Sequence, residues 1–234
     1  MTAQLPLALK LGKHADFNNF YAGSNQELVF RLREMAGQEG FQSLFIWGVP
    51  GSGKSHLLQA VCQLASNTKQ SPIYLDATEL KKLSPELFDG LEQLPVICVD
   101  DVDLLAGDRE WEEALFHLYN RCQQQGHVLV WSASQNPGLL KFVLPDLASR
   151  LTGGSLRYHL VGLNDEQKVE ALRMQAMHRG LSLADNVARY LLTHFSRDMA
   201  DLCNMLDELD HATLAAQRGL TIPFLKQWLA EVRA

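Results

Sequence analysis

The chain has 234 residues, a formal net charge of −6 and a hydrophobic content of 47%. This length suffices for one large domain, or for one domain with a small companion. The acidic balance argues against strong direct binding of DNA, because lysine and arginine contacts with phosphates supply most of that affinity. No apolar run reaches the roughly 18 residues of a membrane span, and the N-terminus lacks a signal-peptide pattern, so we expect a cytoplasmic protein that contacts no membrane.

Residues 1–12 carry leucines at alternating positions and a proline that excludes a helix interior. Gln4, Leu5, Leu7 and Leu9 have the spacing of an extended peptide that docks into a groove on another protein through alternate side chains. An edge strand or an unstructured terminus is the alternative interpretation.

Residues 15–25 combine aromatic side chains with a Gly-Ser-Asn turn, and an amphipathic helix over Gln26–Met35 follows. Ser24 or Asn25 suits the N-cap of that helix. Two functions are open for the aromatic segment: it closes the core, or Phe20, Tyr21 and Ala22 form a wall against a nucleotide base.

Gly48–Ser55 matches the P-loop pattern G-x-x-x-x-G-K-[ST], and the apolar run Leu44–Trp47 precedes it. A strand that enters a glycine-rich turn and then a helix directs several backbone N–H groups into one concavity that fits phosphate. Lys54 would reach the outer phosphates, and Ser55 would bind Mg²⁺. The residues predicted to contact the nucleotide here are Gly48, Pro50, Gly51, Ser52, Gly53, Lys54, Ser55 and His56.

A second apolar run, Val96–Val99, ends in Asp100 and Asp101. Such a run is typical of a central parallel strand, and ligands bind beyond the carboxyl ends of such strands. We expect Asp100 to orient Mg²⁺ and Asp101 to position an attacking water; a simple capping pair is the alternative. A short strand over Pro72–Asp76 and a modest helix over Leu87–Leu94 are predicted before this run.

The remaining chain divides into a strand-containing part and a helical part. A helix over Glu110–Gln125 and a strand over His127–Ser132 lead to Ser134. Here the chain resembles the AAA+ nucleotidases, in which a small polar residue at this strand end contacts the γ-phosphate, so the resemblance makes Ser132 or Ser134 the candidate; ordinary turn residues are the alternative. A short helix then begins at Pro145, and a last strand covers Leu156–Leu160. From Asn164 onward the pattern is helical, with a capping-box start, so we expect domains over 13–161 and 162–234 after the peptide of residues 1–12.

This order of motifs resembles the AAA+ nucleotidases, and five local strings resemble the AAA+ module of the bacterial replication initiator DnaA. The strings are Phe17–Asn25, Gly53–Leu58, Asp100-Asp101, Leu147–Leu151 and Leu220–Phe224. The resemblance implies an α/β P-loop domain with a five-stranded parallel sheet, followed by a small all-helical lid. The interval from Asp76 to Val96 is too short for an extra DnaA helix, and no helix-turn-helix follows the lid, so the chain is most similar to the Hda-type branch of DnaA-related proteins.

The resemblance also implies partners and roles. Arg150 would be an arginine finger inserted into the ATP site of DnaA, while the Gln4–Leu9 peptide would bind the sliding clamp, the β subunit of DNA polymerase III. The chain would then be a negative regulator of replication initiation, with a homodimer or larger oligomer possible. An ATPase of the helicase-loader type is the alternative.

The chain's own nucleotide site departs from the family pattern. Ala200 stands where a sensor 2 arginine is expected, and Arg197, one helical turn earlier, is the candidate to replace it. We therefore expect ADP or another nucleoside diphosphate with Mg²⁺ bound by Ser55 and Asp100, with ATP possible, and weak hydrolysis.

Overall fold

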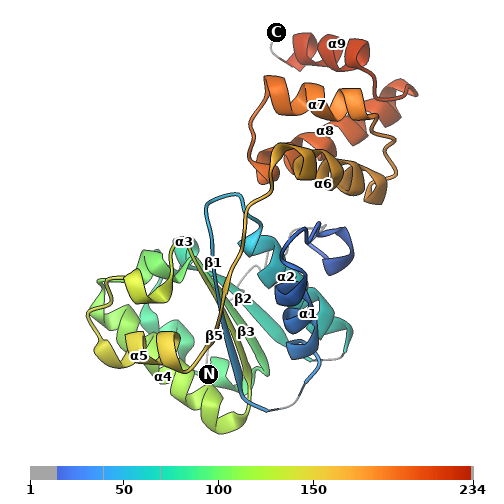
Figure 1. Cartoon of the computed structure of the whole chain (residues 1–234). Helices are drawn as coiled ribbons and strands as arrows, with labels where there is room; N and C mark the ends of the chain where they lie inside the picture. The colour runs from blue at the N-terminus through green and yellow to red at the C-terminus, as the bar shows by residue number, and fades with distance from the viewer. Residues whose placement is uncertain (1–14, 39, 69, 233–234) are drawn as a thin grey trace. The chain divides into compact units, whose positions relative to one another are not determined.

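The computed structural model describes residues 15–38, 40–68 and 70–232, which form two compact units (Figure 1). The first unit contains Asn25–Val49 and Lys54–Leu160. The second contains the chain from Val161 onward together with Asn18–Ser24 and Pro50–Gly53. Part of the P-loop and the aromatic segment thus group with the helical part of the chain.

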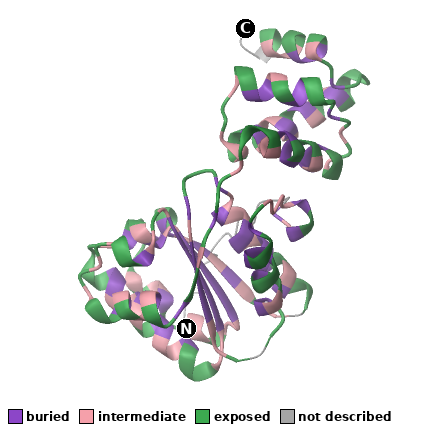
Figure 2. Cartoon of the chain, in the orientation of Figure 1, coloured by how far each residue is buried: buried purple, intermediate pink, exposed green. Residues whose placement is uncertain are grey.

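The first unit is built on a parallel sheet in the order β2-β3-β4-β1-β5. Its strands are β1 (Gln42–Trp47), β2 (Pro72–Asp76), β3 (Val96–Asp100), β4 (Val128–Ala133) and β5 (Leu156–His159). Every residue of β3 and β4 is buried, as expected for strands covered by helices on both faces (Figure 2). Because β1, β3 and β4 run parallel to one another, their carboxyl ends lie at one edge of the sheet, where the P-loop begins.

Helices cover both faces of this sheet (Figure 1). α1 (Gln26–Met35) and α2 (Lys54–Asn67) lie on one face, and α4 (Arg109–Gln125) and α5 (Pro145–Gly153) lie on the other. The shorter elements are α3 (Ala77–Leu80), η1 (Phe17–Asn19), η2 (Pro85–Phe88), η3 (Leu91–Gln93), η4 (Val102–Leu105) and η5 (Pro137–Leu139). Phe45, Tyr119 and Trp131 are fully buried between the layers.

The predicted helix over Leu87–Leu94 is wrong. The structure has two short 3₁₀ helices, η2 and η3, in its place. Gly90 between them has φ +89°, a left-handed conformation that interrupts a right-handed helix.

The second unit contains a bundle of four helices, α6 (Asp165–His178), α7 (Asp185–His194), α8 (Met199–Ala216) and α9 (Ile222–Val232). Leucines such as Leu172, Leu191 and Leu206 are fully buried in its core. The capping box at the start of α6 is confirmed: Asn164 accepts from the amide of Gln167, whose side chain accepts from the amide of Asn164. Among the described helices, none has the length and hydrophobicity needed to cross a bilayer.

Candidate functional site

The P-loop follows β1 directly, and its glycines adopt conformations that other residues rarely reach. Gly51 has φ +73° and Gly53 has φ +102°. The loop ends where α2 begins at Lys54, so Ser55 lies in the first turn of that helix. The predicted strand, loop and helix are therefore present, in the arrangement that presents backbone N–H groups to an anion.

Lys54 is buried, although it carries a charge. Its Nζ donates to the carbonyl oxygen of Gly48 at 3.1 Å and lies 3.8 Å from Oδ1 of Asp101. An ammonium group has three donors and costs free energy when it is buried without anionic partners. Its position after the loop therefore suits a phosphate group as a further acceptor.

Asp100 is fixed at the end of β3 by hydroxyl groups from both neighbouring strands. Tyr74 of β2 donates to Oδ2 at 2.6 Å, and Ser132 of β4 donates to Oδ1. Burial and the Asp100 charge raise the pKa of Tyr74 well above its usual value, so this phenol stays a donor at all physiological pH values. These two bonds hold the carboxylate in one orientation at the edge where ligands bind.

Asp101 has a left-handed backbone with φ +50°, which is unusual for a residue other than glycine. Its amide donates to Oγ of Ser132 at 2.9 Å, so one serine is bonded to both acids. Burial, followed by the charge of Asp100, raises the pKa of Asp101 to about 6, while Lys54 acts in the opposite direction. Backbone strain and a raised carboxyl pKa are both features that concentrate at functional sites.

The two serines considered for contact with a γ-phosphate have different partners. Ser132 bonds to the acids at the end of β3, whereas Ser134 donates from both its hydroxyl and its amide to Oδ2 of Asp103. The other oxygen of Asp103 is buried without a hydrogen-bond partner among the described residues. Ser134 remains the candidate that is not bonded to Asp100 or Asp101.

The loop fits the phosphates of a nucleotide. The hydroxyl of Ser52 is buried and has no hydrogen-bond partner in the described part of the chain. With the positive-φ glycines and the buried Lys54, this polar atom is typical of a site built for an anionic group. Ser55 and Asp100 supply the oxygen donors that Mg²⁺ prefers when it is shared with phosphate oxygens.

The aromatic segment in the second unit lies against the P-loop. A Cβ on Gly53 would be 2.8 Å from Cε2 of Phe20, so the ring packs directly on this glycine. Helix α6 fixes the segment through two side chains. Nε2 of Gln175 donates to the carbonyl oxygen of Asn19 at 2.6 Å, and Nε2 of His178 lies 3.1 Å from the carbonyl oxygen of Asn18. Tyr21 and Ala22 follow, both half-buried.

His56 is bonded within the first unit. Its Nε2 lies 3.0 Å from the carbonyl oxygen of Asp16. The ring thus ties α2 to the segment before η1, whether or not the residue also contacts a nucleotide.

Arg150, on α5, is half-buried and lies over an aromatic ring. Its Cζ is 5.6 Å from the ring centroid of Tyr119, whose hydroxyl donates to the carbonyl oxygen of Gly154 at 2.9 Å. Burial raises the pKa of Tyr119, and the Arg150 charge acts in the opposite direction. Within the described residues, no carboxylate forms an ion pair with Arg150.

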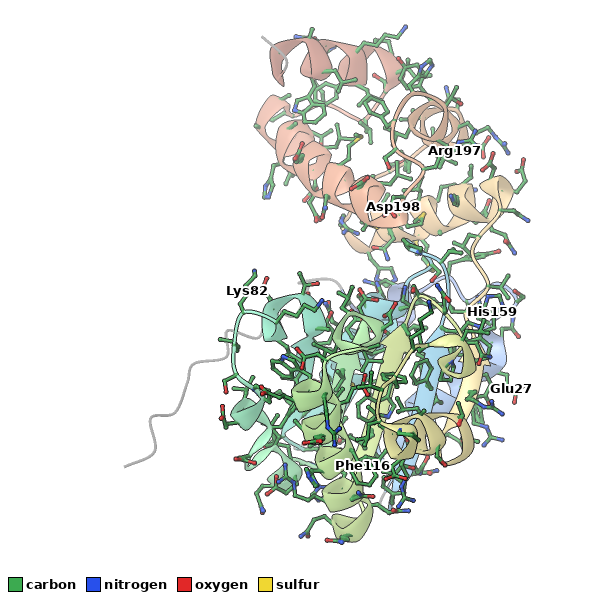
Figure 3. The ribbon with its side chains drawn as sticks, turned by 90° about the vertical axis from the view of Figure 1, so that its left-hand side faces the viewer. Glu27, Lys82, Phe116, His159, Arg197 and Asp198 are labelled. Atoms are coloured by element: carbon green, nitrogen blue, oxygen red, sulfur yellow. The ribbon has the colours of Figure 1, made fainter. Side chains whose placement is uncertain are left out.

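Two charged residues, Arg197 and Asp198, directly precede α8 (Figure 3). Arg197 is the candidate to replace a sensor 2 arginine. Nη1 of Arg197 is 3.5 Å from Oδ2 of Asp165, and both side chains are exposed. The next residue, Asp198, faces the P-loop: a Cβ on Gly51 would be 3.0 Å from its Cγ and closer still to its Oδ2. Ala200 is exposed and carries no charge.

Two models of known protein families match this chain. The model of the bacterial DnaA ATPase domain matches residues 11–157, which is more than half of the chain. The chain belongs to the DnaA ATPase domain family. The model of the Hda lid domain matches residues 165–229, so this is an Hda-type, DnaA-related protein.

Solved structures of DnaA have the same fold. Domain III of the Thermotoga maritima replication initiation protein DnaA is 20% identical, with a TM-score of 0.72 over 91% of this chain and 96% of that one. AMPPCP-bound DnaA from Aquifex aeolicus is 21% identical, with a TM-score of 0.71 over 96% of this chain and 71% of that one. The predicted α/β AAA+ domain with a five-stranded parallel sheet and a helical lid is confirmed.

Other predictions for this DnaA-related protein stay predictions. Gln4, Leu5, Leu7 and Leu9 lie outside the described residues. The structure brings Lys54, Asp100 and Asp101 together at one edge of the sheet, and their roles stay predictions.

Three residues that contact predicted site residues were not themselves predicted: Tyr74, Asp103 and Asp198. Tyr74 and Asp103 act through hydrogen bonds between neighbouring strands and loops. Asp198 could have been recognised as the N-cap of α8, because an aspartate directly precedes the helical pattern. No local signal indicates its contact with Gly51.

Proposed function

We propose that this DnaA-related protein is a nucleotide-bound regulator of replication initiation that, together with the DNA-loaded sliding clamp, stimulates ATP hydrolysis by DnaA. In this proposal the reaction takes place in the ATP site of DnaA, and Arg150 completes that site from outside. Clamp binding by the Gln4–Leu9 peptide would bring the protein to DNA, which its own net charge of −6 does not favour.

The observation that carries the proposal is the state of Arg150. The guanidinium is supported by the ring of Tyr119 and has no ion pair within the described residues, so its charge is available to a partner. An arginine that stabilises the transferring phosphoryl group raises the rate of hydrolysis by about 10³ to 10⁵. α5, which carries Arg150, belongs to the first unit and is covered by the match to the DnaA ATPase domain.

The chain's own pocket favours binding over turnover. Asp101 is one methylene shorter than a glutamate at this position, and Ala200 provides no cation. Arg197, the candidate replacement, is paired with Asp165. We infer that the pocket holds a nucleoside diphosphate with Mg²⁺ through the P-loop, Ser55 and Asp100, and that Phe20, Tyr21 and Ala22 border the base. Two similar solved structures are of DnaA bound to AMPPCP, which supports nucleotide binding in this fold.

Reconstitution tests this function. Purified protein, sliding clamp, primed DNA and ATP-loaded DnaA are mixed, and release of inorganic phosphate is measured. We expect Arg150→Ala to abolish the stimulation while ADP binding, measured by calorimetry, is unchanged. Arg109→Ala is the matched control, since Arg109 is an exposed arginine of the same unit that pairs with Glu113 at 2.8 Å.

Two outcomes contradict the proposal. Full stimulation by Arg150→Ala would remove the arginine finger from the mechanism. Rapid ATP hydrolysis by the chain alone, without DnaA, would favour the helicase-loader alternative. The double change Gln4→Ala and Leu7→Ala should abolish the stimulation measured with the DNA-loaded clamp. It should leave ADP binding by the chain intact.

A further inference from the structure

The second unit places a carboxylate directly against the phosphate-binding loop. Asp198 lies so close to Gly51 that a Cβ on this glycine would be 3.0 Å from Cγ of the aspartate and closer to Oδ2. Asp198 and Pro50–Gly53 belong to the same compact unit. The N–H groups of such a loop normally face an anionic ligand, so a fixed anion beside them is unexpected.

The two oxygens of Asp198 have different surroundings. Oδ1 accepts from the amide of Ala200 at 2.7 Å and caps α8, while the amide of Asp198 donates to Oγ of Ser196 at 3.1 Å. The bond to Oδ1 orients the carboxylate and leaves Oδ2 directed at Gly51. The N-terminus of α8 also favours a negative charge at this position.

No lysine, arginine or histidine among the described residues forms an ion pair with this carboxylate. Arg197, the preceding residue, pairs with Asp165, and Lys168 donates from Nζ to the carbonyl oxygen of Arg197 at 2.7 Å. Ala200, two residues after Asp198, has no charge. The lid segment that contacts the P-loop therefore presents an anion.

We propose that Asp198 is a specificity-determining residue that makes the P-loop favour nucleoside diphosphates over triphosphates. The inference rests on the proposed nucleotide site and adds a cause for its selectivity. Coulomb repulsion grows with the charge of the ligand, and a triphosphate carries one more negative charge than a diphosphate. A carboxylate held on the loop thus weakens triphosphate binding more than diphosphate binding.

The test compares dissociation constants for ADP and for the non-hydrolysable triphosphate AMPPCP, each with Mg²⁺, by isothermal titration calorimetry. The variant is Asp198→Asn, because asparagine caps a helix as well as aspartate does and removes only the charge. Asp201→Asn is the matched control, since Asp201 is an exposed acid in the first turn of the same helix. Asp198→Ser, which also retains a capping oxygen, serves as a second variant.

We expect Asp198→Asn to improve AMPPCP binding relative to ADP binding by about fivefold, because the half-buried carboxylate no longer repels the one extra negative charge of the triphosphate. Asp201→Asn should leave the ratio of the two dissociation constants unchanged. An unchanged ratio in both Asp198 variants, or an equal gain for both nucleotides, overturns the inference while the nucleotide site stands. Failure of the unsubstituted protein to bind either nucleotide would instead overturn the proposed site, and the inference with it.

Discussion

At the residue scale, Asp101 combines an unusual backbone with an unusual acidity. Its φ of +50° places the side chain beyond the end of β3, where it is near Lys54 but also near Asp100 and Asp103. Burial and these acids raise its pKa to about 6, against an ordinary value of 3.8. The carboxylate form is thus less favoured in the folded chain than in the unfolded chain.

This shift predicts how stability depends on pH. Between about pH 4 and pH 6 the folded state binds more protons at Asp101 than the unfolded state, so the contribution of this residue to the free energy of unfolding falls as pH rises. Urea unfolding measures the free energy of unfolding of the unsubstituted protein and of Asp101→Asn. The value for the variant should rise relative to that for the unsubstituted protein as pH increases over this range, and the difference should be constant at higher pH. Equal dependence of the unfolding free energy on pH in the two proteins over this range would contradict the raised pKa of Asp101.

The sequence predicted many of the residues at the site but few of the bonds between them. The P-loop and Asp100-Asp101 are continuous strings with a fixed chemical meaning, so Lys54, Asp100 and Asp101 could be assigned in advance. The bond from Tyr74 to Asp100 depends on β2 lying beside β3, with Asp76 paired to Asp100. Strand order is a property of the folded sheet, and no local pattern records it.

At the element scale, Glu112 connects three parts of the first unit. Its side chain is fully buried in α4 and accepts from the amides of Gly107, Val143 and Leu144. Leu144 is the N-cap of α5, so this carboxylate fixes the start of the helix that carries Arg150. A buried carboxylate that accepts from three backbone N–H groups is costly to disturb, because three donors depend on it.

Removal of these acceptors should destabilise the protein strongly. We expect Glu112→Ala to lower the free energy of unfolding by about 3–5 kcal/mol, and Glu112→Gln by about 1–3 kcal/mol, because an amide retains one acceptor oxygen. Glu113→Gln is the control: the neighbouring acid makes only an exposed ion pair with Arg109, worth about 0.5 kcal/mol or less. Urea unfolding monitored by circular dichroism measures all three, and equal losses for positions 112 and 113 would contradict this role.

Element boundaries were predicted well where the pattern was long and periodic. The helix over Gln26–Met35 and the apolar strands β3 and β4 agree closely with the structure. The error at Leu87–Leu94 arose because spacing of leucines there satisfies a helical pattern while Gly90 takes a left-handed conformation. A side-chain pattern does not determine the φ of a glycine, since glycine permits both signs.

At the scale of the whole molecule, the central question is whose nucleotide is hydrolysed. Two features of the protein are proposed to act on ATP in different ways: its own acid at Asp101, and the guanidinium of Arg150, which is free of ion pairs with described residues. If Arg150 serves the ATP site of DnaA, the two features belong to different active sites, and changes in them should have separable effects. If the chain is an independent ATPase, Asp101 governs turnover directly.

Phosphate release in the reconstituted mixture separates these cases. Under the proposed function the chain's own site binds nucleotide without turnover, so we expect Asp101→Asn to keep full stimulation of DnaA. Arg150→Ala should instead reduce stimulated hydrolysis by about 10³-fold or more. Nucleotide occupancy of each variant, determined after rapid desalting, shows that the proteins compared carry the same ligand. Loss of stimulation in Asp101→Asn at full ADP occupancy would mean that hydrolysis in this chain's own pocket drives the reaction, contrary to the function proposed.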